Sequence, residues 1–137
     1  GGVATALEEL ATAAGVGISV DMDALAPYPE TRTMCNALGL DPPGLIGSGS
    51  LPVAARPDDA AGLLAELAEA DIDAREVGQA VAPAGGGRST GPGAPADEPV
   101  AAGAGTTEGR VRAVRDGRPV PFPRFARDEL ARLYGQP

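Results

Sequence analysis

The sequence predicts an α+β fold, a sandwich in which helices pack on a mixed β-sheet. Segments with helical spacing of apolar residues alternate along the chain with short, strand-like segments. The 137 residues are enough for one core of two or three layers but not for two separate cores. Aromatic residues make up 3% of the chain, so we expect the core to be aliphatic and thinly filled.

The first two elements are a helix and a strand. Apolar residues recur at helical spacing from Val3 to Ala14, and Gly15 stands where a helix would end. Residues 16–21, VGISVD, then alternate in the manner of a strand. Together they predict an amphipathic helix of about three turns followed by a strand.

A second, short helix is predicted between Pro29, which can open a helix, and Gly39, which can close one. Its apolar side chains, Met34, Cys35 and Leu38, are expected to face inward. A lone cysteine in such a stripe is more often a small buried hydrophobe than a nucleophile.

The next segments predict strand, helix and strand. Residues 51–55, LPVAA, are apolar enough for a strand, although Pro52 cannot donate to a ladder and therefore indicates an edge position. Asp58 is the expected N-cap of the following helix, whose buried stripe would be Leu63, Leu64 and Leu67. Residues 72–83 supply another strand or two.

The last third of the chain begins with a stretch that has little to bury. Residues 84–105 are mostly Gly, Ala, Pro, Ser and Thr, which predicts a flexible loop. The following residues predict a hairpin with Asp116-Gly117 at its turn and then a short amphipathic helix, stabilised by an Asp128–Arg132 pair. Residues 106–137 would thus complete the domain whose core is formed by residues 1–83.

The charges exclude several functions. The chain has a net charge of −8, no lysine and no histidine, so nucleic acid is an unfavourable partner and a halophilic source is expected. Without histidine the chain has no imidazole base, and its single cysteine permits no internal disulfide and no cysteine-rich zinc site. The cysteine usage favours a reducing, cytoplasmic compartment, and the longest apolar runs are too short to cross a membrane.

The segment GLIGSGSL, residues 44–51, has the composition of a phosphate-binding loop. A P-loop requires a lysine, which this chain lacks, and a dinucleotide-binding turn requires a third glycine and a following helix. The segment therefore predicts a turn in which Gly47 and Gly49 allow positive φ angles.

Charged residues offer weaker candidate sites. Three carboxylate pairs could act as Mg²⁺ ligands, although solvated faces and helix caps explain them as well: Asp21 with Asp23, Asp58 with Asp59, and Asp71 with Asp73. Arg110, Arg112 and Arg115 could line an anion pocket, or simply form a solvated strand face.

Two long blocks resemble the C-terminal domain of the aminoimidazole ribonucleotide (AIR) synthase, or PurM-like, superfamily. The first is GGVATALEELATAAGVGISVD, residues 1–21, and the second is CNALGLDPPGLIGSGSLPVAARPDDAAGLLAEL, residues 35–67. The resemblance runs from Gly1 to about Val81. It implies an α+β sandwich that closes a cleft over ATP and a small-molecule substrate, with ATP and Mg²⁺ bound mainly by the protein's own N-terminal domain. Members are usually dimeric.

The resemblance implies that this chain is the C-terminal, cleft-closing domain of an ATP-dependent AIR synthase-related enzyme, inactive when isolated. The residues expected to face the substrate or nucleotide are Gly1, Gly2, Gly47, Ser48, Gly49 and Ser50; no catalytic or metal-binding residue is expected. A non-catalytic module for dimerisation or partner binding is the alternative. Further alternatives are relatives of thiamine-monophosphate kinase or of the maturation protein HypE, although the family's tail cysteine is not found in LYGQP, residues 133–137.

Overall fold

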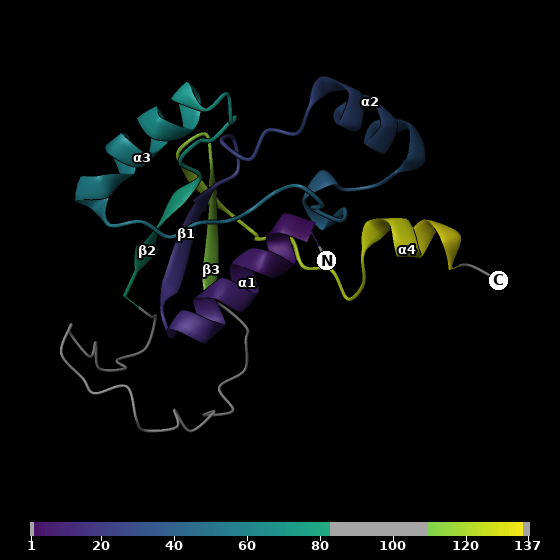
Figure 1. Ribbon diagram of the computed structural model, residues 1–137. Coiled ribbons are helices and arrows are strands. Elements are labelled where there is room, and N and C mark those ends of the chain that lie inside the picture. Colours follow the sequence, from purple (N-terminus) through teal and green to yellow (C-terminus); the bar gives the residue numbers. More distant parts are fainter. Residues whose placement is uncertain (1, 83–109, 136–137) are drawn as a thin grey trace.

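The computed structural model describes residues 2–82 and 110–135, which form four α-helices, one short 3-10 helix and a four-stranded sheet (Figure 1). The elements are α1 (Gly2–Ala14), β1 (Gly17–Asp21), α2 (Pro29–Leu38), η1 (Pro42–Gly44), α3 (Pro57–Glu69), β2 (Gly78–Val81), β3 (Val111–Arg115), β4 (Arg118–Val120) and α4 (Glu129–Tyr134). The strand order is β2-β1-β3-β4. The pair β1–β3 is parallel and the other two pairs are antiparallel, so the predicted α+β class with a mixed sheet is confirmed.

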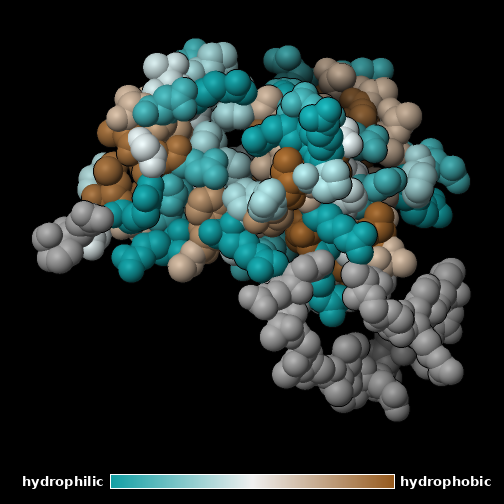
Figure 2. Space-filling view, turned by 180° about the vertical axis from the view of Figure 1, so that it is seen from behind, coloured by the Kyte–Doolittle hydropathy of each residue, from teal (hydrophilic) through white to brown (hydrophobic). Residues whose placement is uncertain are grey.

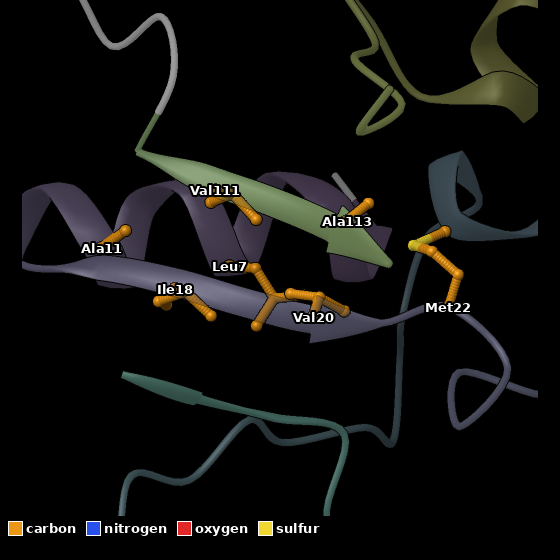
Figure 3. Close-up of a cluster of buried hydrophobic side chains, with 7 residues drawn as sticks. All are labelled: Leu7, Ala11, Ile18, Val20, Met22, Val111 and Ala113. Carbon is orange, nitrogen blue, oxygen red and sulfur yellow. The ribbon is translucent and has the colours of Figure 1, made fainter. Parts of the chain in front are cut away.

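Helix α1 covers one face of the sheet, where the core lies. Strand β1 alternates from Ile18 onward: Ile18 and Val20 are buried toward α1, while Ser19 and Asp21 occupy the opposite face. The buried cluster is aliphatic apart from Met22, as the composition predicts; its members are Leu7, Ala11, Ile18, Val20, Met22, Val111 and Ala113 (Figure 3). Two of these seven come from β3, which lies beyond residue 109 in the sequence.

Helix α2 has the predicted bounds, but its exposed face differs from the prediction. Gly39 ends it in the left-handed conformation at φ 63°, and Cys35 is buried. The inward placement of Met34 and Leu38 is wrong, since these side chains are 64% and 47% exposed. The reason is that α2 packs on η1 at one end of the domain, away from the sheet, and this contact covers a single narrow face (Figure 1).

The strand predicted at residues 51–55 is absent; these residues form an irregular, exposed segment. Leu51 is 83% and Val53 is 62% exposed, and Pro52 has no N–H to give to a neighbouring strand. Hydrophobic residues, coloured brown, also reach the surface at several places on the face shown in Figure 2. The strand predicted within residues 72–83 is confirmed as β2, an edge strand that pairs with β1.

The helix after this segment, α3, starts two residues earlier than predicted. Its N-cap is Arg56 rather than Asp58, and Asp59 accepts a hydrogen bond from the Arg56 guanidinium at 2.7 Å. Pro57 supplies the first helical position, where its missing N–H costs nothing. None of the three predicted core leucines of α3 is fully buried; all three are partly buried.

The C-terminal elements agree with the prediction in type. The hairpin β3–β4 turns at Asp116 and Gly117, whose φ angles are 50° and 72°, as a type I′ turn requires. Asp128 caps α4 by accepting from the Leu130 N–H at 2.9 Å, whereas Arg132 pairs with Glu129 and not, as predicted, with Asp128. The loop predicted at residues 84–105 lies outside the described residues.

Candidate functional site

The first turn of α1 and the Gly47–Ser50 turn, two segments far apart in the sequence, meet at a small cleft. The cleft has a volume of about 220 Å³, and its lining residues are Gly2, Val3, Thr5, Ala6, Glu9, Gly47, Ser50 and Pro52. Of the six residues expected to face a ligand, Gly2, Gly47 and Ser50 thus line one cleft. Ser48 and Gly49 are exposed beside it, and Gly1 lies outside the described residues.

Glycine at position 2 permits the close approach that forms this cleft. Its φ angle is 89°, and a Cβ built there would lie 2.6 Å from the carbonyl oxygen of Leu45 and 2.7 Å from that of Pro43. A side chain would therefore push η1 and the turn away from α1. The turn itself is closed by a hydrogen bond of 2.9 Å from the Ser50 N–H to the Gly47 carbonyl.

Besides backbone groups, the polar side chains that line this cleft are those of Thr5, Glu9 and Ser50. The first turn of α1 contains no acidic residue, and the partial positive charge at the start of a helix favours an anion. The charged residue among the lining residues is Glu9, which disfavours a phosphate by its charge. The cleft can contact a polar ligand, but it supplies no cation to neutralise one.

The described residues do not fit a metal ion by themselves. Within residues 2–82 and 110–135 no group of three or more His, Cys, Asp or Glu side chains could hold one. Some aspartates of the candidate carboxylate pairs already have another partner: Asp21 accepts from the Asp23 N–H at 2.9 Å, and Asp73 binds Arg75 at 3.0 Å. A Mg²⁺ site formed by this part of the chain is therefore not supported.

A second and larger cleft, of about 470 Å³, lies on the sheet face opposite α1. Its lining includes Ser19, Asp21, Asp23, Glu76 and Gln79. The carboxylate of Asp23 accepts from the Asp116 N–H at 2.8 Å and thereby ties the β3–β4 turn to the end of β1. This cleft was not among the predicted sites, although the alternation of residues 16–21 indicates that Ser19 and Asp21 lie on the outward face of β1.

The arginines near the hairpin do not gather into an anion pocket. Arg112 and Arg115 are exposed on β3, and the Arg115 guanidinium lies 3.9 Å from the Asp23 carboxylate. The solvated strand face, which the sequence left open as the second interpretation, describes their position better.

The Cys35 thiol and the carboxyl groups of Asp41 and Glu129 lie close together where α4 meets α2 and η1. Burial raises the pKa of the Cys35 thiol, and the carboxylates of Asp41 and Glu129 raise it further. Burial and the neighbouring Glu129 also raise the pKa of Asp41, while Arg115 opposes this shift. A thiol with a raised pKa carries little thiolate near neutral pH, so Cys35 is unsuited to nucleophilic chemistry. No sequence signal placed these groups together.

No helix in the described part of the chain is long and apolar enough to cross a membrane. No solved structure matches the chain significantly. Curated proteins that match it include carbamoyl dehydratase HypE of Rhizobium leguminosarum bv. viciae, 36% identical over 67 residues, and that of Rhodobacter capsulatus, 42% identical over 67 residues. A third is carbamoyl dehydratase HypE of Cupriavidus necator, 34% identical over 83 residues.

These alignments cover 49%, 49% and 59% of this chain, but 19%, 20% and 24% of the three relatives. The chain thus spans about a fifth to a quarter of their length. The relatives are HypE proteins, a group that the sequence analysis kept as a further alternative. The family described as AIR synthase related protein, C-terminal domain, matches residues 1–89, which include every element from α1 to β2 and the Gly47–Ser50 turn. The chain therefore belongs to the family of AIR synthase-related C-terminal domains.

Proposed function

We propose that this chain is the cleft-closing C-terminal domain of a cytoplasmic, ATP-dependent enzyme that phosphorylates or otherwise activates a small-molecule acceptor. The observation that carries the proposal is the juxtaposition of Gly2 with the Gly47–Ser50 turn, both inside the family match. Because the described residues offer neither a metal cluster nor a cation at this cleft, ATP and Mg²⁺ would be bound mainly by a preceding domain. This domain would supply backbone amides and serine hydroxyls to one wall, and the enzyme would act as a homodimer.

The acceptor class is a second, more specific proposal. The curated relatives are named carbamoyl dehydratases, and at 34–42% identity over the aligned residues they favour a carbamoyl group as the acceptor. The cysteine of this chain would not carry that group, because Cys35 lies inside α2 with 2% of its surface exposed. A carbamoyl group presented by another molecule or another segment would then be dehydrated: its oxygen would take the γ-phosphoryl group of ATP, releasing ADP, and would leave as phosphate while the nitrogen loses both protons, so that a nitrile remains. A non-catalytic module that binds a partner remains the competing function.

The test uses a longer form of the protein that includes a preceding domain, with ATP and Mg²⁺ as the probe and ADP release as the readout. We expect the double substitution Ser48→Ala with Ser50→Ala to lower the rate, and residues 1–137 alone to release no ADP. Ser19→Ala is the matched control, because Ser19 lines the larger cleft instead. ADP release by residues 1–137, or a double variant as active as the unaltered enzyme, would contradict the proposed role of this cleft.

A further inference from the structure

The short helix η1 is held between two tight contacts. On one side lies Gly2, whose hypothetical Cβ would collide with the carbonyl oxygens of Pro43 and Leu45. On the other side, a Cβ on the buried Gly44 would lie 2.6 Å from the ring of Phe125 and 2.7 Å from Cγ of Glu129. A displacement of the segment that precedes and begins α4 would therefore be transmitted to the start of α1.

Glu129 is the buried charged residue of the described chain, with 7% of its surface exposed. Its carboxylate accepts a hydrogen bond of 3.0 Å from the Asp41 N–H, which precedes η1, and pairs at 3.0 Å with Arg132. Arg132 also donates to the Gly39 carbonyl at 2.7 Å, at the end of α2. Residues 39–41 connect α2 to η1. Through Gly39 and Asp41, Arg132 and Glu129 thus bind α4 to both ends of this connection.

We propose that Glu129 is a positioning residue that fixes η1 and thereby holds the Gly47–Ser50 turn against the first turn of α1. Glu129 acts on the turn through Asp41 and η1, because η1 is continuous with the turn. Helix η1 ends at Gly44, three residues before Gly47, whose carbonyl accepts the hydrogen bond from the Ser50 N–H that closes the turn. The shape of the small cleft then depends on α4, an element outside the family match at residues 1–89. The proposal concerns the shape of the cleft and does not depend on the ligand.

The experiment is amide hydrogen exchange of the 137-residue chain, followed residue by residue by NMR. In Glu129→Ala we expect exchange at Gly44, Leu45 and Ser50 to accelerate about tenfold, because the partly buried hydrogen bond from the Asp41 N–H to the charged carboxylate is lost. The sheet amides of Ile18 and Met22, which donate to Arg110 and Val114, should keep their rates. Glu129→Gln retains an acceptor for the Asp41 N–H and should restore most of the protection.

Two further variants separate positioning from general stability. Glu66→Ala, the same change at an exposed site on α3, should leave all these rates unchanged. Gly44→Ala alters no charge but pushes Phe125 and Glu129 away, so it should reproduce the pattern of Glu129→Ala. The proposal is overturned if Glu129→Ala accelerates sheet and η1 amides equally, or if it affects Asp41 while Ser50 keeps its rate.

Discussion

Replacing Val20 by alanine tests whether the core of this sparsely filled domain is the α1–sheet contact. Val20 lies on β1 between its register partners Gly78 and Ala113 and is 1% exposed. The change removes two methyl-sized groups, worth about 1.6 kcal/mol of transfer free energy at about 0.8 kcal/mol each. The unfilled space adds to this, so we expect a loss of about 2–3 kcal/mol in the free energy of unfolding. For a domain of this size the melting temperature should fall by roughly 10–20 °C.

Val53 provides the matched control, because Val53→Ala is the same chemical change at a side chain that is 62% exposed. We expect this variant to differ from the unaltered chain by less than about 0.5 kcal/mol. The assay is urea unfolding followed by circular dichroism, with a thermal melt of the same samples. Equal losses for the two variants would refute the placement of the core, and a large loss for Val53→Ala would mean that residues 51–55 are packed after all.

Two further predictions concern the cluster between α2 and α4. Since the folded-state pKa of Asp41 is raised above its ordinary value of 3.8, its protonation favours the folded chain, so its contribution to the free energy of unfolding increases as pH falls through the raised pKa. Asp41→Asn should therefore increase the free energy of unfolding at neutral pH and weaken its dependence on pH above 3.8. Urea unfolding at several pH values measures both effects, and an unchanged pH profile would contradict this assignment. The buried Cys35 thiol should react with a thiol reagent much more slowly in the folded chain than in urea, and equal rates would show that α2 leaves it accessible.

Local signals in the sequence predicted most of the individual elements. Gly39 ends α2 and Asp116-Gly117 turns the hairpin because each position requires a positive φ angle, and such requirements are satisfied within a few residues. The alternation in residues 16–21 likewise identified β1, because a strand with one buried face repeats every second residue. These features depend little on what the rest of the chain does.

Features that depend on distant partners could not be predicted in the same way. The apolar spacing in α2 showed that one face is apolar, but not that η1 would cover Cys35 and leave Met34 in solvent. The burial of Glu129 depends on the N–H of Asp41, 88 residues away, and nothing near Glu129 indicates that partner. The composition of residues 44–51 identified a turn, whereas its contact with Gly2 required the three-dimensional structure.

The placement of β3 has a consequence for where this domain can be cut. Its backbone joins β1 directly, yet it lies beyond residue 89, where the family match ends. A polypeptide truncated at that point would keep α1 and β1 but leave one side of β1 without a neighbour, and an unpaired apolar strand edge is prone to aggregation. During synthesis the sheet can be completed only after β3 has left the ribosome. The segment that must fold together therefore extends to β3, well past residue 89, where the family match ends.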